Sequence, residues 1–242
     1  VGPHAIAVLD YITTRDVTKL YPGKSVYACM LNDRGHFTDD CIVYRTGPNS
    51  WMLVHGSGTG HEEIVKQAVG RNCAVLFDDD LHDLSLQGPL AVGYLEKHVP
   101  GIRDLKYFHH MQTSLFGAPV MISRTGYTGE LGYEIFCHPK DALAVFDAVW
   151  AAGEPHGLKP MGLEALDMVR IEAGLIFANY EFNDQTDPFE AGIGFTVPLK
   201  SKGDDFIGRD ALVRRKENPR QVLVGLDIDA NDHAGHGDCL HI

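Results

Sequence analysis

The stretch LNDRGHFTDDCIVY, residues 31–44, joins a strand end, a polar turn around Gly35 and a second strand, and predicts a β-hairpin. Two adjacent carboxylates, Asp39 and Asp40, stand at the start of the second strand. Asp is depleted in strands, and neighbouring side chains point to opposite faces, so one of the two must point inward. An inward carboxylate must be hydrogen-bonded, paired or functional. Taken alone, the pattern favours a strand-end cap or turn partner over a catalytic group.

The stretch RTGYTGELGYEIF, residues 124–136, is the second that departs from an ordinary loop. Its three closely spaced glycines and two threonines predict a tight loop between strands, where backbone can approach a ligand and Tyr127 can stack on a flat ring. Glu134 follows in a strand, facing the side opposite to its two neighbours. A carboxylate there can accept two parallel N–H bonds from an amidine-like edge. The alternatives are that Glu134 faces solvent or pairs with Arg124.

The stretch GLEALDMVRIEAGL, residues 162–175, predicts a helix that ends at Gly174. Most of its apolar residues have the spacing of a core face. Arg170 stands beside Glu172, and this arrangement favours a structural ion pair over a ligand contact.

Two further segments resemble functional sites but have simpler explanations. The stretch HGSGTG, residues 55–60, lacks the Lys-Ser/Thr of a phosphate-binding loop, so a glycine-rich turn from strand to helix suffices. The pair His109 and His110 lies near a strand, where alternation points one imidazole inward. A hydrogen-bonded core histidine is favoured, and a proton donor or acceptor near a substrate is the alternative.

Short strands and amphipathic helices follow one another irregularly along the chain. Strands are predicted at residues 25–31, 41–44, 51–55, 74–77, 84–87, 119–123 and 133–136. Helices are predicted at residues 6–13, 60–69, 90–98, 141–152 and 163–174. The lack of a steady β-α alternation favours an α+β fold.

The chain divides by composition near residue 200. We expect residues 1–200 to form one α+β region of two subdomains, with their boundary near residues 80–110. The polar segment 200–205 is expected to be a surface loop. Residues 201–242 are expected to form a linker and the start of a truncated further domain, with a strand at residues 222–228.

The bulk composition excludes several classes of protein. The 242 residues carry a formal net charge of -12, which opposes nonspecific nucleic-acid binding. No apolar run approaches the ~18 residues of a membrane-spanning helix, and the first residues lack a signal-peptide layout, so we expect a cytoplasmic protein with no membrane partner. The 5 cysteines and 13 histidines show neither a disulfide framework nor zinc-ligand spacing, so no metal is expected.

Four motifs together resemble the folate-binding region of the glycine-cleavage T-protein (aminomethyltransferase) family. They are the LNxxGxxxDD hairpin, the LSLQGP turn at residues 84–89, the RTGYTGExGYE loop and the helix end RIEAGL. Their order and spacing match over nearly the whole chain. The resemblance implies an α+β fold of mixed and antiparallel sheets with packed helices, and a C-terminal β-barrel domain that is largely missing here.

The resemblance also implies a cofactor and the residues that hold it. The cofactor is tetrahydrofolate. Asp40 is implied as the catalytic group beside its reactive nitrogens, and Glu134 as the carboxylate that holds the pterin edge. Tyr127 is implied to lie near the same ring, and Arg124 is the remaining candidate for cofactor binding.

The implied activity is transfer of a methyl or aminomethyl carbon from a small-molecule donor to folate. Leu166 stands where the aminomethyltransferase typically has a folate-holding arginine, and an isobutyl group cannot replace a bidentate cation. His109 and His110 fall where that enzyme is typically apolar. Both departures favour a demethylase of an aryl ether or similar donor over aminomethyl transfer. Tyr27 and the two histidines are candidates for substrate contact, and a lipoyl carrier protein is the expected partner of a true glycine-cleavage enzyme.

Two other functions remain as alternatives. A folate-binding scaffold or assembly factor without turnover is one, although that branch of the family carries a KGCYxGQE-type segment that is absent near residues 189–192. A module of a flavin-linked dimethylglycine or sarcosine oxidase is the other.

Overall fold

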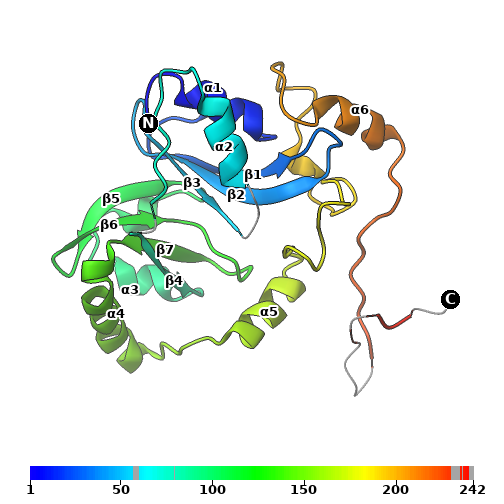
Figure 1. The fold of residues 1–242 in the computed structure, drawn as a ribbon. Helices are drawn as coiled ribbons and strands as arrows, with labels where there is room; N and C mark the ends of the chain where they lie inside the picture. The colour runs from blue at the N-terminus through cyan, green and yellow to red at the C-terminus, as the bar shows by residue number, and fades with distance from the viewer. Residues whose placement is uncertain (57–59, 79, 230–234, 236, 240–242) are drawn as a thin grey trace.

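The computed structural model describes residues 1–56, 60–78, 80–229, 235 and 237–239. Within these ranges the chain forms two antiparallel sheets, each with helices on one face (Figure 1). The predicted α+β class, with antiparallel sheets and packed helices, is confirmed. The glycine-rich segment 55–60 falls partly outside the described residues. In the part described, no helix has the length and apolar character needed to cross a membrane.

The first sheet has three strands in the order β1 (Ser25–Leu31), β2 (Phe37–Arg45) and β3 (Trp51–His55). Helix α1 (Ala5–Ile12) covers one face, and α2 (Gly60–Ala68) packs beside it. Alternate residues of the strands supply the apolar side chains under α1, since period-2 side chains share a face. The core under α1 contains Leu9, Ile12, Val17, Leu20, Ala28, Met30, Cys41, Val43 and Ile207.

A β-bulge interrupts the hairpin formed by β1 and β2. Cys29 pairs with Asp40, but Leu31 pairs with Phe37, so β2 carries one extra residue. As a result Asp40 lies on the same face as Phe37, although simple alternation from Phe37 would place Asp39 there. The bulge therefore decides which of the two carboxylates turns away from α1.

The second sheet has the order β4 (His82–Gln87), β7 (Gly132–Cys137), β6 (Ala118–Ser123) and β5 (His110–Leu115). Helices α3 (Ala91–Leu95) and α4 (Pro139–Gly153) cover one face over a continuous apolar core. The opposite face is turned toward the first sheet, where Met121 and Phe136 pack against Tyr44. We call the faces of the two sheets that meet here the inter-sheet faces.

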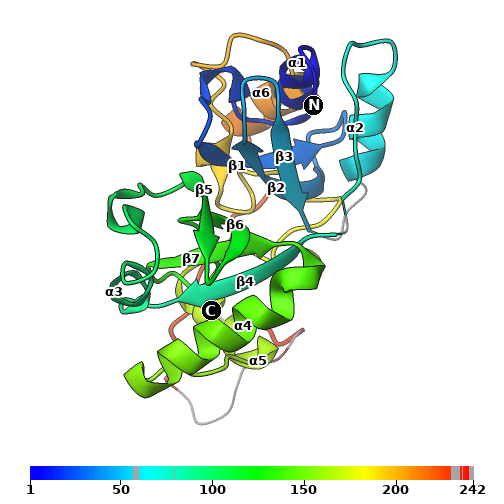
Figure 2. The same ribbon diagram turned by 90° about the vertical axis from the view of Figure 1, so that its left-hand side faces the viewer.

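The two sheets are joined where β1 and β5 begin (Figure 2). Lys24 and His109 form an antiparallel bridge, and the His110 N–H donates to the Gly23 carbonyl at 2.9 Å. The Ser25 N–H donates to the Phe108 carbonyl, also at 2.9 Å. These backbone bonds fix the sheets to each other beside their inter-sheet faces.

Helix α5 (Leu163–Glu172) lies apart from both sheets, and the chain then returns to the first sheet (Figure 1). The returning segment ends in α6 (Arg209–Glu217). Its apolar side chains cover the inter-sheet face of β1 and β2 next to the hairpin turn, where they pack against Cys29, Leu31 and Phe37. These side chains are Ile176, Phe182, Ala191, Ile193, Val197, Phe206 and Leu212. Short 3-10 helices occur at η1 (Val17–Lys19), η2 (Ile102–Asp104), η3 (Glu154–His156) and η4 (Gly194–Thr196).

The structure corrects several local predictions. Residues 74–77 and 222–228 are not strands, because they are largely exposed and have no neighbouring strand with which to pair. Strand β5 was not expected, and neither was α6, whose mostly charged sequence buries just Ala211 and Leu212. Lys202, in the expected surface loop 200–205, is 1% exposed. The domain boundary near residue 200 stays a prediction.

Candidate active site between the two sheets

The two adjacent carboxylates of β2 have different surroundings. Asp40 is half-buried on the inter-sheet face, where the Tyr27 hydroxyl donates to its Oδ2 at 2.7 Å. Asp39 is buried on the opposite face; its Oδ2 lies 2.8 Å from His55 Nδ1, and its Oδ1 accepts the Asp40 N–H at 2.9 Å. Asp39 therefore fixes the backbone, and Asp40 is the carboxylate presented to the space between the sheets.

The surroundings of Asp40 raise its pKa above the usual value for an aspartate. Burial raises the pKa of Asp40, the hydrogen bond from Tyr27 lowers it, and the nearby Asp39 charge raises it further. Burial and the Asp40 charge in turn raise the pKa of Tyr27, so that its hydroxyl stays a donor. A carboxyl group in this setting can both give and accept a proton.

Replacing Tyr27 by phenylalanine is expected to shift the acid limb of the pH–rate profile to higher pH. The change removes the donor that lowers the pKa of Asp40, so a higher pH is needed to ionise the carboxyl group. At a pH on this acid limb, turnover should fall about tenfold, as for a lost hydrogen bond to a charged group. A pH series of kcat measures this. The exposed Tyr107→Phe is the matched control, and an unshifted acid limb in Tyr27→Phe would contradict the assignment.

Glu134 lies on the inter-sheet face of β7, in a row of polar side chains that crosses the second sheet. Register places His110, Ser123, Glu134 and Ser85 side by side on β5, β6, β7 and β4. The Thr125 hydroxyl donates to Glu134 Oε2 and lies 2.8 Å from the Ser123 hydroxyl.

The carboxyl group of Glu134 is largely buried, and it forms no ion pair with any residue in the part of the chain that the structure describes. Burial raises the pKa of Glu134, and hydrogen bonds from Thr125 and Tyr44 offset part of this effect. The predicted alternative, a pair with Arg124, does not form, because the Arg124 guanidinium donates to the Leu105 carbonyl at 2.8 Å. The hydroxyls of Thr125 and Tyr44 are therefore the groups that stabilise the ionised form of Glu134.

Tyr127 lies in the loop between β6 and β7 and reaches toward the returning segment. Its hydroxyl donates to the Ile176 carbonyl at 2.6 Å. Burial raises the pKa of Tyr127 to about 12, and Asp40 is among the charges that contribute to the rise. Its hydroxyl thus lies within electrostatic reach of Asp40.

The two histidines differ as alternation predicted. His110 is 5% exposed and sets its ring edge against Tyr44, with centroids 5.4 Å apart and planes at 70°. Among the described residues neither of its ring nitrogens has a hydrogen-bond partner of good geometry. Burial lowers the pKa of His110, so that the ring is neutral. His109 is on the surface, with Nε2 2.6 Å from the Tyr21 hydroxyl.

Arg170 is a structural residue. It is 2% exposed and forms ion pairs of 2.7 Å with Asp167 and with Glu181. Its predicted neighbour Glu172 is not among its recorded partners, because residues two apart on a helix do not face each other. Leu166 is half-buried on the same helix.

Sequence reasoning missed Tyr44 and Thr125 as members of the site. Tyr44 is 1% exposed, and its hydroxyl faces Glu134 across the gap between the sheets. Thr125 was noted as part of a tight loop and not as the partner of a carboxylate. A period-2 count back from Tyr44 through Ile42 to Asp40 would have placed all three on one face.

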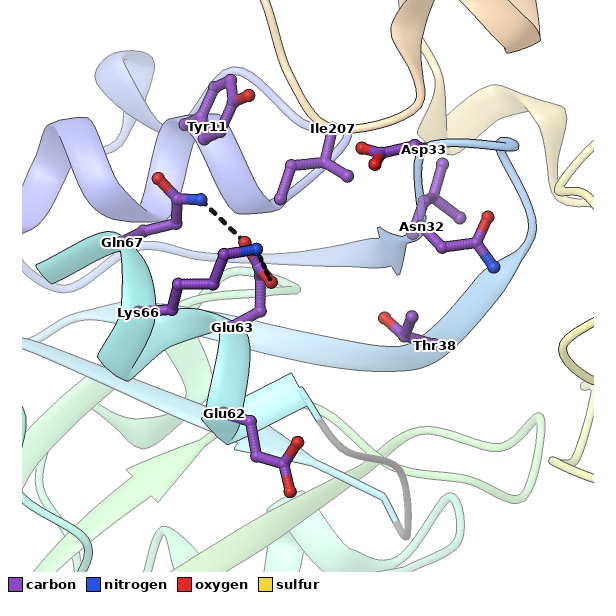
Figure 3. A pocket seen from close by; sticks show the side chains of 10 residues that line it. Tyr11, Asn32, Asp33, Thr38, Glu62, Glu63, Lys66, Gln67 and Ile207 are labelled. Carbon is purple, nitrogen blue, oxygen red and sulfur yellow. Dashed lines mark hydrogen bonds and ion pairs between the residues drawn. The ribbon is translucent and has the colours of Figure 1, made fainter.

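A separate hollow of about 260 Å³ lies between α1, α2 and the hairpin turn (Figure 3). Its lining includes Asn32, Asp33 and Thr38. Two of its polar groups, Lys66 and Gln67, bond to Glu63 at 3.2 and 2.7 Å. None of the site residues described above lines it, and we do not assign it a function.

Comparison with known proteins gives relatives over nearly the whole chain. The chain is 56% identical to the heme-dependent oxidative N-demethylase gamma subunit of Ectopseudomonas mendocina, over 99% of this chain and 66% of that protein. It is 55% identical to the trimethylamine-oxide aldolase of Ruegeria pomeroyi, over 100% of this chain and 32% of that protein. An aminomethyltransferase of Symbiobacterium thermophilum is 38% identical, over 94% and 64%. The chain thus spans two thirds or less of the length of these relatives.

A solved structure has the same fold. The glycine cleavage system aminomethyltransferase T from Bartonella henselae superposes with a TM-score of 0.80 at 31% identity, over 89% of this chain and 59% of that one. The family model described as the GCVT N-terminal domain matches residues 1–201. With this match over most of its length, the chain belongs to the glycine-cleavage T-protein family.

Proposed function

We propose that this chain transfers a one-carbon unit to tetrahydrofolate, with the carbon delivered as formaldehyde that a separate reaction has released from an N-methyl group. The observation that carries the proposal is the pair of half-buried carboxylates, Asp40 and Glu134, on inter-sheet faces that meet through Tyr44. Two of the relatives are named for N-demethylation and for action on trimethylamine oxide. Both names favour an N-methyl donor over the aryl ether expected from the sequence.

The residues present fit a reduced pterin. Glu134 offers a desolvated carboxylate fixed by Thr125, and such a group can accept two N–H bonds from an amidine-like edge. In the part of the chain that the structure describes, the buried Gln87 Oε1 has no hydrogen-bond partner. Unpartnered buried groups of this kind are costly unless a ligand or water completes them.

The proposed mechanism assigns a separate task to each carboxyl group. Tetrahydrofolate, when bound, would supply secondary amine nitrogens that take up the carbon of formaldehyde with loss of water. Glu134 orients the ring, and the sheets exclude bulk water around it. The Asp40 carboxylate would take the proton that an attacking nitrogen loses, and the protonated carboxyl group would then give it to the departing oxygen. Tyr27 holds Asp40 Oδ2 in place during both steps.

Replacing Glu134 by glutamine tests folate binding. Loss of a charge-assisted bidentate contact should weaken tetrahydrofolate binding about 10- to 100-fold, from ~1.5–3 kcal/mol. Because burial raises the pKa of Glu134, wild-type affinity should also fall as pH drops through that raised value, and the variant should lose this dependence. Titration calorimetry over a pH series measures both. The exposed Glu130→Gln, from the same loop, is the control, and equal affinities would contradict the role of Glu134.

The reaction itself is tested by the rate at which the full-length protein forms methylenetetrahydrofolate from formaldehyde and tetrahydrofolate. A rate no higher than in buffer would reject the transferase. Formation of 5-methyltetrahydrofolate from methoxybenzoates would instead support the aryl-ether demethylase, and folate binding without turnover the scaffold. The flavin-linked module stays a prediction. The mass of the native polypeptide and its absorption spectrum, which would show a bound flavin, check it. Partner subunits, or a lipoyl carrier, are tested by co-purification.

A further inference from the structure

The LSLQGP turn supplies Gln87, to which the proposed mechanism assigns no step. Its Gln87 ends β4, on the inter-sheet face that also carries Ser85 and Glu134. The Gln87 Nε2 lies 3.1 Å from the Ser85 hydroxyl, and it donates to the Thr125 carbonyl and the Tyr133 carbonyl, each at 3.2 Å. These two acceptors fix the orientation of the amide, because a flipped amide would set its oxygen against two carbonyls.

Two glycines of the RTGYTGELGYE loop make room for this amide. A Cβ at Gly126 would lie 2.1 Å from Gln87 Oε1, and a Cβ at Gly132 would lie 1.9 Å from it. Neither glycine has a backbone conformation that itself demands glycine. At Gly126 the physical reason for glycine is therefore the slot that the Gln87 side chain fills, while at Gly132 a Cβ would also lie 2.8 Å from the Gln87 Cα.

We propose that Gln87 is a positioning residue that holds the Thr125 hydroxyl on Glu134. The amide ties the Thr125 carbonyl in the loop to the Tyr133 carbonyl on β7, next to Glu134 in sequence. The Thr125 side chain then donates to Glu134 Oε2. A carboxylate held in one orientation before binding loses less entropy when it accepts a planar ligand edge. This inference rests on the proposed folate site.

The proposed role of Gln87 predicts a change in the protonation of Glu134 that can be measured without any ligand. The Thr125 hydroxyl stabilises ionised Glu134, so releasing the loop should make Glu134 protonate at higher pH. Other groups that face Glu134 are Asp83 on β4 and Tyr44 on β2, with His110 further along the row on β5. None of these is tied to Gln87 by a recorded hydrogen bond, so their effects should remain in the variant.

The experiment compares Gln87→Ala, Gly126→Ala and the double variant in the full-length protein. Carboxyl ¹³C NMR of the free protein follows Glu134, and calorimetry follows tetrahydrofolate. Each single change should weaken binding about tenfold, as for two neutral hydrogen bonds, and should move the Glu134 midpoint to higher pH. The double variant should bind about as well as either single one, because the added Cβ of residue 126 would then occupy the vacated slot. Gln112 is an exposed residue of β5, and the control variant Gln112→Ala should match wild type in folate affinity and in the Glu134 midpoint.

Three results would overturn the inference. They are unchanged binding in both single variants, additive losses of about 100-fold in the double variant, and a lower melting temperature with an unmoved Glu134 midpoint. The last result would assign Gln87 a merely structural role. If wild type fails to bind tetrahydrofolate, the proposed function fails, while the midpoint in the free protein still decides the link from Gln87 to Glu134.

Discussion

Asp40→Asn is expected to lower one-carbon transfer about 1,000-fold, within the ~10²–10⁴ contribution of a positioned acid or base. Asparagine keeps the shape of the side chain and an oxygen for the Tyr27 hydroxyl, but it cannot exchange a proton. The loss should therefore fall on kcat, with tetrahydrofolate affinity changed little, because Glu134 is proposed to hold the ring. Steady-state kinetics and calorimetry on the full-length protein separate the two effects.

The same substitution should leave the fold at least as stable as the wild type. Burial raises the pKa of Asp40 in the folded chain above its unfolded value, so the folded state holds more protons between these two values. Stability then falls as pH rises through that window, and above it the charged Asp40 destabilises the fold. Asp33→Asn makes the same chemical change at an exposed position of the hairpin turn. Full turnover in Asp40→Asn would reject Asp40 as the acid or base.

Lys202→Met is expected to destabilise the protein by about 3–5 kcal/mol, the range for breaking a buried ion pair on one side. Lys202 Nζ donates to the Thr13 carbonyl at 3.0 Å and to the Arg15 carbonyl at 2.9 Å, and lies 3.3 Å from Asp10 Oδ1. Methionine would leave the buried Asp10 carboxylate and the carbonyls at the end of α1 without this donor. For a chain of this size the loss corresponds to roughly 10 °C in Tm.

Two variants make the Lys202 prediction specific. Lys200→Met changes an exposed lysine two residues away and should leave the melting temperature near that of wild type. Asp10→Asn combined with Lys202→Met removes the unpaired charge but keeps an acceptor for the Val17 N–H, which Asp10 Oδ1 binds at 2.9 Å. The double variant should recover part of the lost stability. A single variant that melts with wild type would show that the ion pair contributes nothing net.

Much of the fold could be predicted because its signals are local. The hairpin around Gly35 and strands β1 and β3 follow from turn chemistry and period-2 patterns, and β1 and β3 have the predicted bounds. Helices α4 and α5 follow from apolar residues three and four apart. The segments 74–77 and 222–228 were wrong for the complementary reason: apolar composition does not make a strand where no partner strand lies alongside.

The sequence by itself determined which chemical groups are available: an adjacent pair of carboxylates, a glycine-rich loop and a carboxylate within a strand. Tertiary structure decided how they are used. A one-residue bulge turned Asp40, and not Asp39, to the inter-sheet face. Packing of two sheets brought Tyr44 to Glu134, from positions 90 residues apart in the chain. Neither outcome follows from a local pattern, because register shifts and contacts between sheets depend on how distant segments bury their apolar faces together.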